Sequence, residues 1–98
     1  MHKVIARGGD WERVKKRKPQ QFDAINHALS AYQRLAQYTR LGYVPKDRAL
    51  RLWSDRISAA WPSIESFISW RRKEEGYEKS WESLVWFARE GGANVTID

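Results

Sequence analysis

The sequence predicts an all-α fold, a small bundle of about four helices with a basic N-terminal arm. Three observations point to this fold. Apolar residues recur at helical spacing through most of the chain. Five of the six tryptophans lie between Leu50 and Trp86, and such large side chains can fill one core. Prolines and glycines divide the chain at positions that are typical of helix starts and stops.

The 98 residues are enough for one domain at most. We predict a basic N-terminal arm over residues 1–19, a helical bundle over residues 20–92 and a C-terminal tail over residues 93–98. Residues 2–6 and 93–97 are short segments with β-branched residues, and each lies next to a pair of glycines. They either pair as a minor two-stranded ribbon on the helices or remain separate tails, and the sequence leaves both alternatives open.

Within the arm, residues 11–17 are expected to form a short helix. Asp10 is a suitable N-cap residue for it. Trp11 and Val14 are three positions apart and therefore share one face of this helix. Pro19 disfavours helix at the residue before it and suits the start of the next helix.

The first long helix is predicted over residues 20–41. Its apolar residues follow the period of an amphipathic helix with one buried stripe. Gly42 directly follows and is expected to end the helix. The stripe consists of Phe22, Ile25, Leu29, Tyr32 and Ala36.

Two further helices are predicted over residues 45–60 and 62–75. Pro62 either begins a separate helix or kinks a continuous one. We predict a break with a tight turn, because an internal proline removes a backbone hydrogen bond and clashes with the preceding turn. Gly76 is expected to end the second of these helices. The residues expected on the inner faces are Leu50, Trp53, Ile57, Trp61, Ile64, Phe67, Ile68 and Arg71.

A last helix is predicted over residues 81–89, with Ser80 as its N-cap residue and Gly91 as its stop. Trp86 falls on the face opposite to the apolar residues of this helix. The expected inner face consists of Trp81, Leu84, Val85 and Ala88.

Positive charge is concentrated near the N-terminus. The net charge is +6, and residues 1–18 carry seven of the eighteen lysines and arginines against two acidic residues. Such a cluster can neutralise phosphates, and a tryptophan beside it can stack on a base. The alternative is a solvated arm that keeps the protein soluble. The predicted nucleic-acid contacts are Trp11, Arg13, Lys15, Lys16, Arg17 and Lys18.

Two tryptophans, Trp70 and Trp86, fall away from the apolar stripes of their predicted helices. Tryptophan and arginine are the residue types that dominate protein–protein interfaces. We therefore predict a protein-binding surface on the last two helices. Its residues are Trp70, Arg71, Arg72, Trp86 and Arg89.

No constellation of residues in the sequence indicates catalysis or metal binding. Cysteine is absent and there are only two histidines, so the acidic residues between 74 and 82 lack the partners of a metal site. No glycine-rich phosphate loop or nucleophile elbow is found. We expect a protein that is not an enzyme and that has no cofactor, no metal and no small-molecule substrate.

The chain contains neither a run of about 18 apolar residues, as a membrane span requires, nor a secretory signal. A cytoplasmic location is therefore expected.

The second half of the chain resembles a group of small uncharacterised bacterial helical domains. Those domains often follow a single membrane-spanning helix, which this sequence does not show, and they have no assigned activity. The resemblance implies a helical fold and no particular function. The residues that carry it are Leu41-Gly42-Tyr43-Val44, Leu50, Trp53, Ile57, Trp61, Ile64, Phe67-Ile68, Arg71-Arg72, Trp81 and Leu84.

The sequence thus favours a small non-enzymatic module that binds a protein, such as a regulator or inhibitor of a larger bacterial or phage machine. The aromatic and arginine surface would form the contact, with a partner protein or with a second copy in a homodimer. The alternative is a nucleic-acid-binding protein that uses residues 13–18.

Overall fold

The structure, a computed structural model, describes residues 8–73 and 80–97. It contains four helices and confirms the predicted all-α class. They are α1 (Gly8–Arg17), α2 (Pro19–Arg40), α3 (Lys46–Arg72) and α4 (Glu82–Glu90). Within the described ranges there is no strand.

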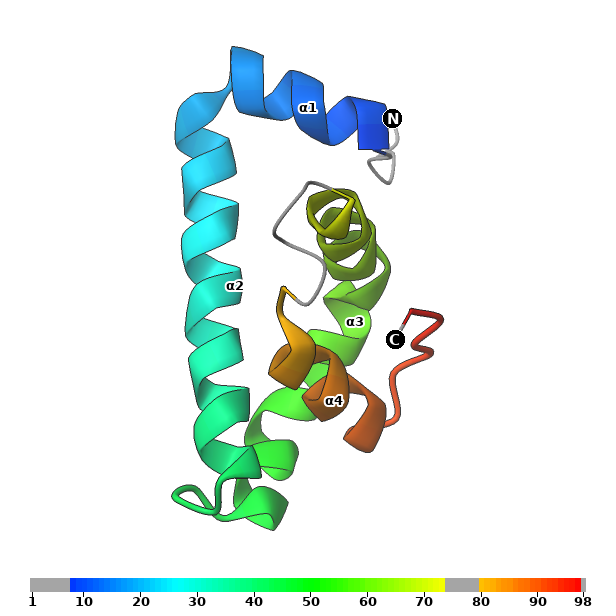
Figure 1. The fold of residues 1–98 in the computed structure, drawn as a ribbon. Coiled ribbons are helices and arrows are strands. Elements are labelled where there is room, and N and C mark those ends of the chain that lie inside the picture. The colour runs from blue at the N-terminus through cyan, green and yellow to red at the C-terminus, as the bar shows by residue number, and fades with distance from the viewer. Residues whose placement is uncertain (1–7, 74–79, 98) are drawn as a thin grey trace.

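The long helix α2 forms one side of the molecule, and α1 lies crosswise over one end of it and over the last turns of α3 (Figure 1). Helix α4 lies between α2 and α3 and contacts both of them. The core therefore fills the space that these four helices enclose.

Helix α1 is held to the bundle by Trp11. This side chain is buried, and its indole Nε1 donates a hydrogen bond to Ser66 Oγ of α3 at 2.9 Å. The helix begins at Gly8, so Asp10 lies inside it and the prediction that Asp10 caps it was wrong. Pro19 occupies the first turn of α2, and Lys18 before it is not helical, as expected for a residue that precedes proline.

The predicted stripe of α2 is confirmed. Phe22, Leu29 and Ala36 are buried, and Ile25 and Tyr32 pack against the core as partly buried residues.

Helix α2 ends in a Schellman motif around Gly42. The Tyr43 amide donates to the Tyr38 carbonyl at 2.9 Å, and the Gly42 amide donates to the Thr39 carbonyl at 3.1 Å. Gly42 has a φ of 90°, which glycine adopts at little cost. The Tyr38 and Tyr43 rings lie 6.3 Å apart, which is the apolar contact that often accompanies this motif.

The predicted break at Pro62 was wrong, because α3 is one helix of 27 residues with Pro62 inside it. Figure 1 shows that this helix changes direction along its length. Pro62 is exposed, and on the solvent side of a helix the carbonyls can tilt outward to accommodate a proline. The helix therefore bends around the core. It ends at Arg72, earlier than predicted, and Gly76 lies outside the described residues.

Helix α4 begins one residue later than predicted, with Trp81 and not Ser80 at the N-cap position. Trp81 adopts the left-handed conformation, with φ 57° and ψ 33°, which costs a residue other than glycine about 1–2 kcal/mol. The cap is supplied from α2, because Gln33 Oε1 accepts a hydrogen bond from the Leu84 amide at 2.8 Å.

Helix α4 ends in a second Schellman motif, in which Gly92 and not the predicted Gly91 has the positive φ. Gly91 is needed for close packing instead: a Cβ atom there would lie 2.7 Å from the Ser54 Cβ atom of α3.

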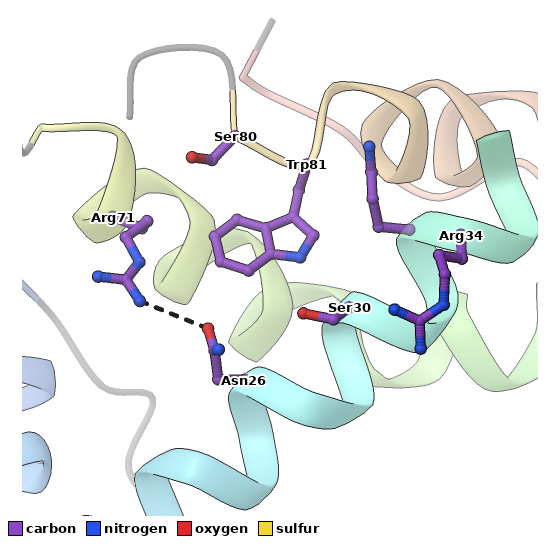
Figure 2. A pocket seen from close by; sticks show the side chains of 7 residues that line it. Asn26, Ser30, Arg34, Arg71, Ser80 and Trp81 are labelled. Atoms are coloured by element: carbon purple, nitrogen blue, oxygen red, sulfur yellow. Dashed lines mark hydrogen bonds between the residues drawn. The ribbon is translucent and has the colours of Figure 1, made fainter. Parts of the chain in front are cut away.

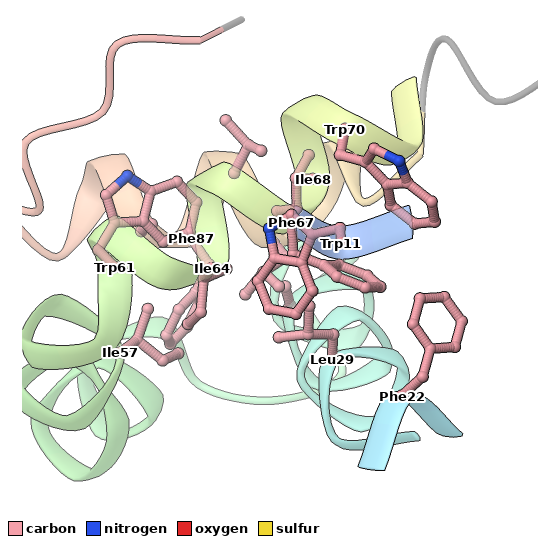
Figure 3. Packing of buried hydrophobic residues seen from close by; sticks show 14 of the residues in the cluster. Trp11, Phe22, Leu29, Ile57, Trp61, Ile64, Phe67, Ile68, Trp70 and Phe87 are labelled. Atoms are coloured by element: carbon pink, nitrogen blue, oxygen red, sulfur yellow. The ribbon is translucent and has the colours of Figure 1, made fainter. Parts of the chain in front are cut away.

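An aromatic cluster at the α1 end of the molecule surrounds Phe67. The ring centroid of Phe67 lies 5.0 Å from that of Trp11, 5.6 Å from Phe22 and 5.5 Å from Trp81. Trp70 completes the cluster at 5.7 Å (Figure 3). These rings come from α1, α2, α3 and the residue before α4, so the cluster ties all four helices together.

The C-terminal residues pack against the core without forming a strand. Ala93, Val95 and Ile97 are partly buried against it. The Thr96 amide donates to Glu65 Oε2 of α3 at 2.9 Å. The other segment of the predicted ribbon, residues 2–6, lies outside the described residues.

Candidate functional site

The positive charges predicted to contact nucleic acid lie on the outside of α1 and at the residue that follows it. Arg13, Lys16, Arg17 and Lys18 are exposed, and we call these four residues the basic face. Lys15 is also exposed, but its Nζ lies 5.9 Å from the centre of the Phe22 ring. The basic face borders shallow hollows at the corner between α1 and α2.

Trp11, predicted to stack on a base beside these charges, is 7% exposed. Its ring packs edge-on against Phe67 and its Nε1 is hydrogen bonded to Ser66. The stacking prediction was therefore wrong, because the helix that carries the basic face uses Trp11 as its anchor in the core.

The predicted protein-binding surface also loses its first tryptophan. Trp70 is buried, with its ring 5.6 Å from that of Phe22. The Arg71 guanidinium lies over both rings, and Arg72 Nε donates to the Ser80 carbonyl at 2.9 Å. The two arginines thus make contacts within the fold.

Trp86 and Arg89 make their contacts away from Trp70. The partly buried Trp86 ring has the Arg40 guanidinium 5.6 Å and the Lys46 amine 5.9 Å from its centre. Trp70 packs on Phe22 near the start of α2, whereas Trp86 lies at Arg40. Arg40 is 18 residues after Phe22 on α2, so the two tryptophans contact points of this helix that are about 27 Å apart. Arg89 Nη2 donates to the Ile97 carbonyl. The prediction that Trp70 and Trp86 share one surface was therefore wrong.

A polar cleft that was not predicted from the sequence opens between α2, the end of α3 and the start of α4. Its volume is about 490 Å³. Asn26, Ser30, Gln33 and Arg34 line it from α2. Arg71, Ser80 and Trp81 line it from the other side (Figure 2).

The geometry of the cleft places an indole between two guanidinium groups. Figure 2 shows Trp81 between Arg71 and Arg34, with Asn26 and Ser30 on the side of α2. Arg71 Nη2 donates a long hydrogen bond of 3.5 Å to Asn26 Oδ1. None of the seven lining residues carries a carboxylate, so the described walls are positively charged.

A signal for this cleft does exist in the sequence. Asn26, Ser30, Gln33 and Arg34 are polar and recur on one side of α2 at helical spacing, next to the apolar stripe. Their partners Arg71, Ser80 and Trp81 come from a distant part of the chain, and only the packing of α3 and α4 on α2 brings them together.

Within residues 8–73 and 80–97, no group of three or more His, Cys, Asp or Glu side chains is arranged to hold a metal ion. In the same ranges, none of the helices has both the length and the apolar character needed to cross a bilayer.

Comparison with protein-family models, with curated proteins and with solved structures gave no match.

Proposed function

We propose that the protein binds nucleic acid through the basic face of α1. The observation that carries this proposal is the exposure of Arg13, Lys16 and Arg17 on α1 and of Lys18 directly after it, while Trp11 fixes the other side of this helix in the core. The protein is still proposed to act by binding, but the basic face takes the place of the protein-binding surface that was predicted on the last two helices.

Because α1 is anchored in the core, its charges can bind an anionic partner at a smaller entropic cost than charges on a free arm. A flexible segment loses conformational entropy when it is ordered on binding, and α1 is already ordered by its contacts with α2 and α3. The five residues from Arg13 to Arg17 span about 6 Å of helix, and Lys18 follows directly. Duplex DNA carries one charge per ~1.7 Å of its axis, so several phosphates lie within reach.

The basic face contains only lysine and arginine, while Gln20 and Gln21 lie at its border. Contacts of this kind with phosphates position a protein on a duplex without reading its sequence. We therefore propose binding with little sequence preference and a strong dependence on salt.

The test is a titration with mixed-sequence DNA and RNA at several salt concentrations. The variant Lys16→Gln/Arg17→Gln removes two charges from the basic face. The matched control Arg48→Gln/Arg51→Gln removes two exposed charges from the start of α3, at the other end of the molecule.

We expect the slope of log Kobs against log salt to fall by about 1.8 in the first variant and to stay unchanged in the control, because each lost phosphate contact changes the slope by ~0.9. No binding at low salt, or an equal change in both variants, would contradict the proposal.

A protein contact at the turn between α2 and α3 is the second candidate. Tyr38, Leu41 and Tyr43 are exposed together there, with 67% exposure at Leu41 and 77% at Tyr43. Adjacent exposed apolar side chains are typical of association surfaces. We propose that a second copy of the chain covers them. Sedimentation at rising concentration is expected to show a dimer that Leu41→Ser/Tyr43→Ser removes, and a monomer throughout would contradict this.

A further inference from the structure

We propose that the polar cleft binds a nucleotide, with the base against Trp81 and the phosphate at Arg34. The nucleotide is either free or an unpaired unit of a strand that the basic face holds. The second source rests on the proposed function, whereas the first does not.

The size and walls of the cleft suit such a ligand. Pockets for small molecules commonly measure about 300–1,000 Å³, and this one measures about 490 Å³. An apolar hollow elsewhere in the described chain, lined by Trp11, Leu29 and Phe67 among others, measures only about 190 Å³, and nearly all of its lining residues are apolar. The polar cleft is thus the one of the two that can hold an ionic ligand.

Trp81 supplies the surface for a planar group. It is partly buried, and the centre of its ring lies 5.5 Å from that of the Phe67 ring. Its backbone conformation is fixed at the start of α4. An indole that is already ordered loses little entropy when it stacks on a base, and stacking on aromatic residues is the usual way in which proteins hold unpaired bases.

Arg34 supplies the charge. It is exposed on α2 at one side of the indole, and guanidinium groups bind phosphates with two parallel hydrogen bonds. Arg71 on the other side is oriented by Asn26 and by the Phe22 and Trp70 rings, so it adds positive charge at a fixed place.

Amide and hydroxyl groups are available for the edge of the base. Asn26 and Ser30 lie beside the indole on α2, and amide side chains pair with base edges as donors and acceptors. Gln33 also lines the cleft, but its Oε1 already accepts from the Leu84 amide, so its remaining donor is the NH₂ group.

The test is calorimetry with adenosine 5′-monophosphate, compared with adenosine, ribose 5-phosphate and a short oligo(dA) strand. Arg34→Ala removes the proposed phosphate contact from an exposed position. Arg51→Ala is the matched control, an exposed arginine outside the cleft. The indole Nε1–H resonance of Trp81, assigned with Trp81→Phe, reports whether binding occurs at the cleft.

We expect adenosine 5′-monophosphate to bind more tightly than either of its two halves and to shift the Trp81 resonance. Arg34→Ala is expected to weaken it about tenfold or more, with Arg51→Ala unchanged. If only the oligo(dA) strand binds, and does so with the same dependence on Arg34, the source is a strand. Lys16→Gln/Arg17→Gln is expected to leave the affinity for the mononucleotide unchanged, which separates this site from the basic face.

The proposal is overturned if neither adenosine 5′-monophosphate nor the oligo(dA) strand binds at low salt. It is also overturned if Arg34→Ala and Arg51→Ala lose affinity equally, or if the Trp81 resonance does not move. The salt-dependent binding of duplex DNA by α1 can survive each of these outcomes, so the two proposals fail independently.

Discussion

The two ends of α2 carry aromatic residues in opposite surroundings. At the N-terminal end Phe22 is buried, with its ring 5.6 Å from both Phe67 and Trp70. At the C-terminal end Tyr38 and Tyr43 contact each other and are 48% and 77% exposed.

The comparison shows that similar residues serve different purposes along one helix. The aromatic cluster around Phe67 joins four segments of the chain, so its loss affects the whole fold. The Tyr38–Tyr43 pair joins two residues that are already close in sequence, and it supports only the end of α2. The basic face lies at the N-terminal end of α2, where ring contacts join the helices.

The largest effect is expected from Phe67→Ala at the centre of the aromatic cluster. Removing a buried phenylalanine costs about 3–5 kcal/mol, because its contacts are lost and a cavity remains. Urea unfolding followed by tryptophan emission measures the change. If the alanine variant does not fold, Phe67→Leu should fold with a smaller loss. A loss below about 1 kcal/mol in the alanine variant would show that the cluster is not central to stability.

The next effect concerns Gly91, where α4 approaches α3 closely. Gly91→Ala is expected to cost about 1–3 kcal/mol, since the new Cβ atom would lie 2.7 Å from the Ser54 Cβ atom. This tight contact involves residues of α3 outside the aromatic cluster. A double-mutant cycle with Ser54→Gly is the check, and additive losses in unfolding free energy would refute the proposed clash.

A smaller effect is expected from Ser66→Ala, which removes the acceptor for Trp11 Nε1. The unfolding free energy should fall by about 1 kcal/mol, the usual contribution of one such hydrogen bond. The exchange rate of the Trp11 indole proton should rise at the same time. An unchanged exchange rate would mean that ring packing alone holds α1.

The smallest effect is expected from Tyr43→Ala at the exposed end. The unfolding free energy should change by no more than about 0.5 kcal/mol, as for most surface substitutions. Thermal unfolding at low protein concentration measures it without a contribution from association. A loss of 2 kcal/mol or more would contradict the contrast between the two ends.

The sequence predicted well those elements whose burial depends on their own periodicity. The stripe of α2 and the stop at Gly42 follow from spacing and from local turn chemistry, and both were confirmed. Pro62 was misjudged because the local cost of an internal proline is offset by packing along both halves of α3.

Burial that depends on distant segments could not be predicted in this way. Trp70 lies off the predicted stripe, but α2 packs against the last turns of α3, and the Phe22 ring covers it. The polar cleft was missed for the same reason, since Arg34 and Trp81 are 47 positions apart in sequence and become neighbours only after folding.

The hydrogen bond between Gln33 and Leu84 has a consequence for synthesis of the protein. The two residues are 51 positions apart, so at about 5–20 residues per second Gln33 is made roughly 3–10 s before its partner. Helix α4 has only nine residues and is too short to be stable alone, so it forms when it reaches α2. Until then the apolar sides of α2 and α3 that α4 covers are open to chaperones and to other nascent chains, and these seconds are the period in which the protein is most exposed to aggregation.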